Sequence, residues 1–176
     1  ICVSGHLRPV KDPFRAALAS RKLPASSKIQ ITHIGAALTP TMELRAIDEM
    51  TRNHRYRWLG EVPNSKAVQL LARSRLLVLS SKLEGGANVV SEAIAASVPI
   101  LASRISGSIG LLGEDYPGYF EVGSTAQLAE LMNRCEQDSD FYAELLSDMK
   151  QLAPQFTPQC EQESLRQLIA DACSMP

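Results

Sequence analysis

Two carboxylates, Glu84 and Glu92, flank a glycine pair in the stretch SSKLEGGANVVSEA, residues 80–93. Glycines between a strand and a helix let a ligand approach the backbone, and the free N–H groups of the first helical turn favour an anion such as a diphosphate. Glu92 follows about one helical turn later, where it could accept hydrogen bonds from both hydroxyls of a ribose. Glu84 would then face the side where a sugar lies. The layout favours a nucleotide-sugar site over a hydrolytic or metal site.

A cationic loop, with His6, Arg8 and Lys11, follows a strand-like run that ends at Gly5. Open α/β sheets bind ligands at the carboxyl ends of their strands, so this position favours Lys11 as a second ligand contact. Simpler interpretations exist for both stretches. A Gly-Gly turn joins strand to helix in many α/β proteins, a Glu in a first turn often only complements the helix dipole, and loop cations are usually solvated.

Length and composition indicate one globular domain, or one domain with a terminal extension. The chain has 176 residues, 45% apolar and 21% charged, with a net charge of −1, which argues against a nucleic-acid partner. It has no apolar run of membrane-spanning length, and we expect no signal peptide. Because it begins at Ile1 inside a strand-like run, without an initiator Met, we expect a fragment of a longer protein.

The cysteines and histidines show no metal-ligand spacing. The cysteines form no C-x-x-C pair, and scattered thiols are typical of a reducing compartment, so we expect a cytoplasmic protein. His33 lies within a strand-like run and is expected to be a core or edge residue. The residues concerned are Cys2, Cys135, Cys160, Cys173, His6, His33 and His54.

Strand-like and helix-like segments alternate along the chain, which predicts an α/β fold with a doubly wound, mostly parallel, Rossmann-like sheet. Asp12 is expected to cap the first helix. The segment 104–123 is rich in glycine and predicts turns, in which Ser106, Gly107 and Ser108 could line the site. Expected strands are 1–5, 28–35, 56–60, 75–80, 99–103 and a short one near 119; expected helices begin near Asp12 and then span 39–52, 64–74, 88–97, 125–137, 140–152 and 158–173, the last three with apolar stripes for packing.

The chain resembles the carboxyl-terminal, donor-binding domain of GT-B glycosyltransferases of family 4, one half of the GT-B fold, from Gly5 to at least Val122. The family carries Gly-Arg-Leu-x3-Lys after its first strand, a Leu-Gly strand end, a Ser before its first Glu, and an E-x7-E signature. The matching residues here are Gly5-His6-Leu7 with Lys11, Leu59-Gly60, Ser81, and Glu84 with Glu92.

The resemblance implies a role for each matched residue. Lys11 would hold the diphosphate, Glu84 and the backbone after it would meet the donor sugar, and Glu92 would hold the ribose. No cofactor or metal is implied beyond the UDP-sugar substrate. The implied catalytic residues are Lys11, Arg8 and Glu84, and the implied donor-binding residues are Gly5, His6, Gly60, Ser81, Gly85, Gly86, Ala87, Asn88, Val89 and Glu92.

Two departures from the family pattern concern the ligand. His6 replaces an arginine that binds the diphosphate, so either Arg8 supplies that charge or the diphosphate is held more weakly. Gly85-Gly86-Ala87 replaces the usual Gly-Phe-Gly and leaves more room near the sugar. Asn88 is then best placed to read a sugar hydroxyl or an acetamide.

Four stretches together, HLRPVKDP, YRWLGEVP, EGGANVVSEA and GLLGEDYPGYF, resemble the bacterial selenosugar synthases of selenoneine biosynthesis. These enzymes join selenophosphate to a UDP-sugar, typically UDP-N-acetylglucosamine. The resemblance implies that residues 1–176 form the donor domain, with carboxyl-terminal helices from about 124, and that the acceptor domain lies upstream. Alternatives are a non-catalytic nucleotide-sugar-binding or interaction domain and a GT-B UDP-N-acetylglucosamine epimerase domain.

Overall fold

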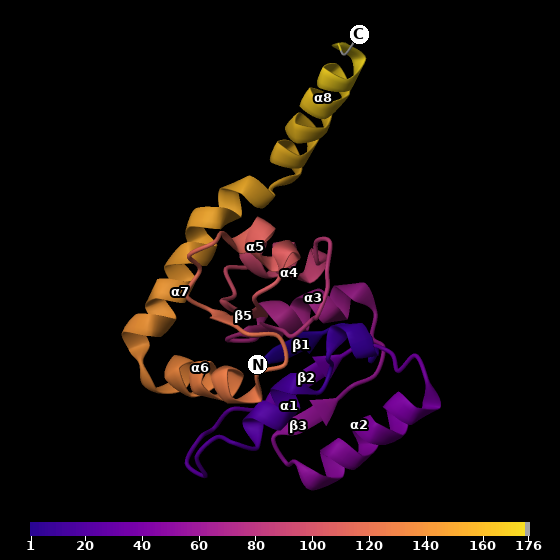
Figure 1. Ribbon diagram of the computed structural model, residues 1–176, viewed down its shortest axis with the longest axis vertical. Helices are drawn as coiled ribbons and strands as arrows, with labels where there is room; N and C mark the ends of the chain where they lie inside the picture. The colour runs from indigo at the N-terminus through magenta and orange to yellow at the C-terminus, as the bar shows by residue number, and fades with distance from the viewer. Residues whose placement is uncertain (175–176) are drawn as a thin grey trace.

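The computed structural model describes the backbone of residues 1–174, and the side chains of all of these except 158, 161, 164, 165 and 172–174. Six strands form one sheet in the order β3-β2-β1-β4-β5-β6, with every neighbouring pair parallel (Figure 1). The strands are β1 Cys2–Ser4, β2 Ile31–Ile34, β3 Tyr56–Trp58, β4 Leu77–Leu79, β5 Ile100–Ser103 and β6 Tyr119–Phe120. The order reverses between β1 and β4, as in a doubly wound sheet.

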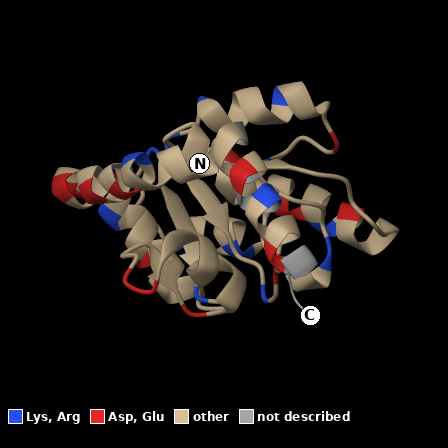
Figure 2. Ribbon diagram, turned by 90° about the horizontal axis from the view of Figure 1, so that it is seen from above, with Lys and Arg blue, Asp and Glu red and all other residues tan. Residues whose placement is uncertain are grey.

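Helices connect the strands and cover the sheet. Helix α1 packs against α6, α3 packs against α4, and α7 bridges α6 and α4. The α-helices are α1 Arg15–Ser20, α2 Pro40–Arg52, α3 Asn64–Ala72, α4 Asn88–Ala95, α5 Ser106–Leu112, α6 Thr125–Gln137, α7 Ser139–Leu152 and α8 Pro158–Ser174; the 3-10 helices are η1 Pro9–Lys11 and η2 Ala153–Phe156. Basic and acidic residues are interspersed along these elements, in keeping with the small net charge (Figure 2).

The central strands β4 and β5 lie in the hydrophobic core. All residues of β4 and β5 are buried, which explains their continuous apolar runs. Helix α2 begins where Thr39 accepts a hydrogen bond from the Met42 N–H, and α6 begins where Ser124 accepts one from the Gln127 N–H. The predicted beginnings of both helices are confirmed.

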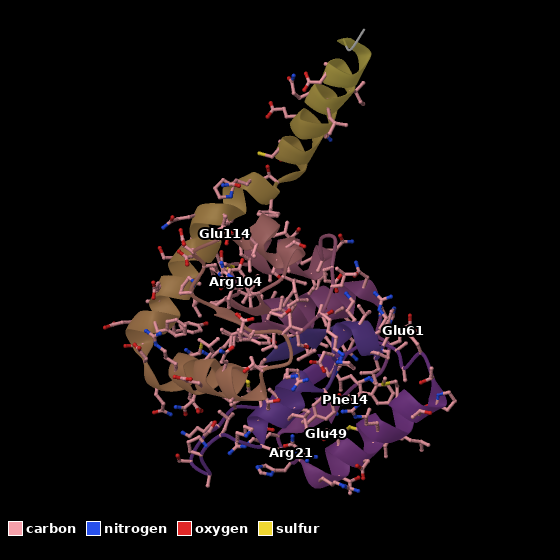
Figure 3. The ribbon with its side chains drawn as sticks, viewed as in Figure 1. Phe14, Arg21, Glu49, Glu61, Arg104 and Glu114 are labelled. Atoms are coloured by element: carbon pink, nitrogen blue, oxygen red, sulfur yellow. The ribbon has the colours of Figure 1, made fainter. Side chains whose placement is uncertain are left out.

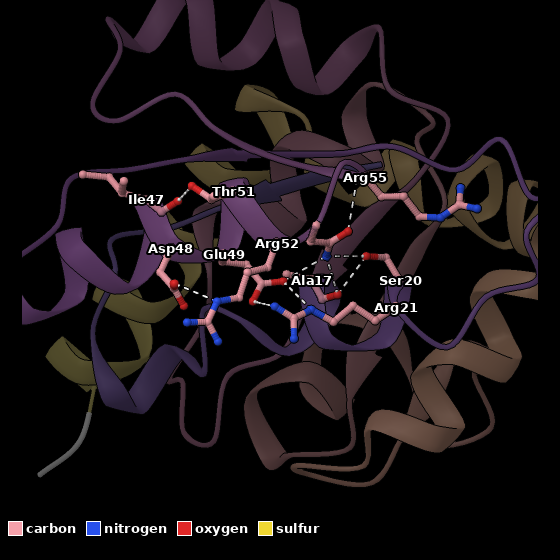
Figure 4. Close-up of polar contacts among 10 residues, drawn as sticks. Ala17, Ser20, Arg21, Ile47, Asp48, Glu49, Thr51, Arg52 and Arg55 are labelled. Atoms are coloured by element: carbon pink, nitrogen blue, oxygen red, sulfur yellow. Dashed lines mark hydrogen bonds and ion pairs between the residues drawn. The ribbon is translucent and has the colours of Figure 1, made fainter.

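A polar network, buried at Glu49 and Asn53 and exposed at Arg21, joins α1 to α2 (Figure 4). The Arg21 guanidinium forms a fork with the Glu49 carboxylate at 3.0 and 2.6 Å. The Asn53 amide donates to the Ala17 carbonyl, the Ser20 hydroxyl and Glu49, at 2.9–3.1 Å. In Figure 3, Arg21 and Glu49 lie together near α2, while Arg104 and Glu114, paired at 2.7 Å, lie well apart from them.

The first helix does not begin as predicted. Asp12 has a left-handed backbone, with φ of 44°, and ends η1, so it does not cap α1. Its carboxylate pairs with Arg15 at 2.7 Å instead.

The glycine-rich segment 104–123 was expected to form turns, but it contains α5. Packing of Leu112 and Ser108 into the interior outweighs the poor helix propensity of Gly107 and Gly110.

The described part of the apolar stripe of α8 is largely exposed. Leu168 and Ile169 are 67% and 54% exposed, and the side chain of Leu165 lies outside the described ones. Helix α8 packs on η2 and projects away from the other elements (Figure 1). The stripe was predicted to be a packing surface, but the described residues provide no surface that covers Leu168 and Ile169.

Candidate functional site

The loops that follow β1 and β4 meet at the carboxyl edge of the sheet. The Ser80 hydroxyl donates to the backbone carbonyls of Asp12 and Lys11, at 2.9 and 3.2 Å. The Lys82 N–H donates to the Val10 carbonyl at 2.8 Å. Residues 68 or more positions apart in the sequence are thereby held at one place.

Lys11, Ser81 and Glu84 form a hydrogen-bonded cluster between these loops. The Lys11 ammonium donates to Glu84 Oε1, and the Ser81 hydroxyl donates to the same oxygen at 2.7 Å. Burial of the carboxyl favours its neutral form, but hydrogen bonds from Lys11 and Ser81 and the charges of Lys11 and Arg8 outweigh it. The pKa of Glu84 therefore lies below its ordinary value. Glu84 is a charged group that cations hold in place.

Beneath the first loop, His33 supports the strand end at Gly5. Its Nε2 lies 3.1 Å from the Gly5 carbonyl, which can only accept, so Nε2 carries the proton. Its Nδ1 then accepts from the Tyr56 hydroxyl at 2.9 Å. Burial lowers the pKa of His33 to about 4, partly offset by the hydrogen bond to Gly5. His33 is therefore neutral near pH 7, and its burial confirms the prediction of a core or edge residue.

Four glycines near the site divide into two kinds. A Cβ on Gly35, which has φ of +141°, would lie 2.2 Å from the Gly5 carbonyl oxygen. A Cβ on Gly107 would lie 2.2 Å from the Glu84 carbonyl oxygen. The fold itself therefore requires these two glycines. Gly85 and Gly86 have no left-handed φ, and a Cβ on either would meet nothing within 4 Å, so packing does not explain their identity.

The remaining candidates occupy the same edge. His6 is exposed and its Nδ1 accepts from the Ala36 N–H at 3.0 Å. Arg8 is exposed, and Gly60, with φ of 70°, accepts from the Gly35 N–H at 2.8 Å. Ala87 is buried in the capping position of α4, and Asn88 and Val89 form the first turn of that helix.

Glu92 lies in the second turn of α4 and is half-buried. Its carboxylate has no hydrogen-bond or ion-pair partner among the described residues. A small cavity of about 10 Å³, lined in part by Gly5, Lys11, Ser80 and Ser81, does not include Glu92. The structure thus brings Lys11, Ser81 and Glu84 into contact, and leaves Glu92 on the adjoining helix with a free carboxylate.

A larger cavity, of about 530 Å³, lies elsewhere. It is lined by Ile1, Lys28, Arg75 and Met132 among others, near the amino ends of β1 and β2, and it includes none of the candidate residues. The carboxyl edge remains the candidate site, because the Lys11, Ser81 and Glu84 side chains meet there.

Sequence reasoning did not identify the supporting residues Ser80, Ser103 and Tyr56. The Ser103 hydroxyl donates to the Ser81 carbonyl at 2.5 Å, so β5 supports the loop that carries Glu84. The sequence signal that could have identified Ser80 and Ser103 is a serine directly at the end of an apolar strand.

Metal ligands, membrane-spanning helices and cysteines can be assessed among the described residues. They contain no cluster of three His, Cys, Asp or Glu that could hold a metal ion. No helix among them has the length and apolarity needed to cross a membrane. Cys2, Cys135 and Cys160 are free thiols, while the side chain of Cys173 lies outside the described ones.

The chain is similar to known glycosyltransferases. Residues 1–156 match the family model described as glycosyl transferases group 1. Over 90 residues, 51% of this chain and 23% of the relative, it is 32% identical to a protein of Bacillus subtilis described as a putative teichuronic acid biosynthesis glycosyltransferase, TuaC.

Two solved structures share the fold. Anabaena HepE, solved in complex with UDP and glucose, superposes with a TM-score of 0.81 at 22% identity, over 96% of this chain and 48% of that one. A glycosyltransferase from Rickettsia africae superposes with a TM-score of 0.83 at 13% identity, over 99% and 48%. The chain therefore spans about half the length of these structures. The predicted fold class is confirmed, because the parallel six-stranded sheet flanked by helices matches GT-B glycosyltransferase structures.

Proposed function

The chain belongs to the glycosyl transferases group 1 family, and on that premise we propose that it is the donor-binding domain of a metal-independent, family-4-like glycosyltransferase that takes a UDP-sugar. The observation that carries the proposal is the meeting of Lys11 and Glu84 beside the amino end of α4. A cation beside a helix amino end, with the Glu92 carboxylate in the second turn of the same helix, suits a diphosphate joined to a ribose.

Each group has a chemical role in this proposal. Lys11 and the N–H groups at the start of α4 hold the diphosphate, and Arg8, whose charge already acts on Glu84, adds to the positive field. As the glycosidic bond breaks, negative charge grows on the UDP leaving group, and these fixed donors stabilise it. Glu92, whose carboxylate is free, accepts hydrogen bonds from the ribose hydroxyls.

The sugar is proposed to lie over Gly85 and Gly86. Neither backbone geometry nor packing requires glycine at these positions, so an approaching ligand is the remaining physical reason for two absent side chains. Exposed Asn88 follows directly and offers an amide donor and acceptor to a hydroxyl or an acetamide.

The relatives support a uridine nucleotide. HepE has been solved in complex with UDP and with UDP-glucose. The finer proposal, transfer from UDP-N-acetylglucosamine to selenophosphate, is supported by the four sequence stretches that resemble selenosugar synthases. In this proposal residues 1–176 are the donor half, and the acceptor site and any catalytic base belong to a further domain of the same protein.

Calorimetric titration with UDP tests the proposal. The wild type is expected to bind UDP, and Glu92→Gln to bind it about tenfold or more weakly, since hydrogen bonds to a charged group are each worth about 1.5–3 kcal/mol. Glu144→Gln, an exposed change on α7, is the matched control and should leave UDP affinity unchanged. EDTA should not alter binding. No heat with UDP, or equal affinity in the Glu92 variant, would refute the assignment.

A further inference from the structure

Lys11 is the cation proposed to bind the diphosphate, and in this structure it is already paired with the Glu84 carboxylate. Both side chains are largely buried, 19% and 12% exposed, so the pair is sheltered from competing water. A diphosphate entering the site must compete with a carboxylate that is already in place.

Glu84 is the fixed member of the pair. Its Oε1 also accepts from Ser81, and the Ser81 carbonyl is held in turn by the Ser103 hydroxyl of β5. The close approach of Gly107 to the Glu84 carbonyl oxygen braces the backbone at the same residue. When Lys11 leaves, Glu84 keeps these supports.

Lys11 is the movable member. Its backbone carbonyl is tied down by Ser80, but its ammonium sits on a flexible four-carbon chain and carries three donors. Arg8, by contrast, is exposed and forms no ion pair among the described residues, so it presents a positive charge to an arriving anion from the outset.

We propose that Glu84 restrains Lys11 in the free protein, and that the diphosphate takes Lys11 over from it. This inference rests on the proposed function, and it adds a regulation of the same site. Arg8 attracts the anion, Lys11 changes partner, and Glu84 stays on Ser81 with its carboxylate turned toward the place of the donor sugar. The exchange weakens binding of anions that cannot compete with a carboxylate for Lys11.

A double-mutant cycle with UDP tests the exchange. Glu84→Gln should raise UDP affinity about threefold to tenfold, the range expected for releasing a partly buried ion pair. UDP lacks the sugar that Glu84 is proposed to contact, so loss of that contact does not affect the measured UDP affinity. In a Lys11→Met background the same Glu84→Gln change should alter affinity less than about twofold, because no cation remains to be released.

The outcomes are distinguishable. If the wild type binds UDP and Glu84→Gln does not bind it more tightly, the exchange is wrong and the proposed function stands. If Glu84→Gln tightens binding equally with and without Lys11, Glu84 acts by repulsion at a distance and the exchange is also wrong. If the wild type does not bind UDP, the proposed function itself fails.

A measurement on the unmodified protein provides a second test that does not depend on a variant folding. The side-chain carboxyl resonance of Glu84, followed by NMR during an acid titration, should report a low pKa in the free protein. With UDP bound the pKa should rise, because burial still favours the neutral carboxyl while the lowering effect of Lys11 is lost and only those of Ser81 and Arg8 remain. An unchanged pKa in the presence of saturating UDP would overturn the exchange.

Discussion

Acidification should destabilise this protein through one buried imidazole, His33. Its pKa is about 4 in the folded chain and about 6.5 in an unfolded one, so between these values the unfolded state binds more protons. Stability therefore falls as the pH falls through this window. From pH 7 to pH 5 the expected loss is about 2 kcal/mol, taking 1.36 kcal/mol per pKa unit.

The assay is urea unfolding followed by circular dichroism at pH 7 and pH 5, for the wild type and for His33→Gln. A glutamine amide can donate to the Gly5 carbonyl and accept from Tyr56, but it does not titrate. The two proteins differ only at position 33, so every other contribution to the pH dependence cancels. The wild type should lose about 2 kcal/mol more than the variant. Equal losses in the two proteins would refute the assignment of His33 as a buried, neutral support.

Three further changes test the packing and the site. Gly107→Ala should cost about 1–3 kcal/mol in urea unfolding, because its Cβ meets the Glu84 carbonyl oxygen, whereas Gly110→Ala in the same helix should cost nothing; equal costs would contradict this. Gly86→Ala should leave the melting temperature unchanged but weaken UDP-sugar binding about tenfold in calorimetry, and a lowered melting temperature with normal binding would be the opposite result. Asn53→Ala should cost about 2 kcal/mol in urea unfolding by leaving partners of its buried amide unsatisfied, and a loss below about 0.5 kcal/mol would show that the network contributes little.

Local sequence signals predicted much of the fold. The continuous apolar runs at β4 and β5, the alternation of strands with helices, and the expected beginnings of the helices 39–52 and 125–137 each depend on neighbouring residues. These fixed the fold class and placed the candidate residues at the carboxyl edge of the sheet.

What sequence reasoning missed depends on contacts between distant residues. The pairing of Lys11 with Glu84 spans 73 positions, and the support of Gly5 by His33 spans 28. Helix α5 forms despite its glycines because tertiary packing overrides local propensity. The stripe on α8 has the pattern of a packing surface, but a pattern cannot show whether its partner lies within the same chain.

The most direct test of the central claim locates UDP on the folded chain. In an NMR titration of the isotope-labelled protein, amide resonances of residues 5–11, Gly60 and residues 85–92 should shift on adding UDP, while those around the 530 Å³ cavity, such as Lys28, Arg75 and Cys135, should not. Shifts confined to that cavity, or absent at residues 85–92, would contradict a diphosphate site between Lys11 and the amino end of α4.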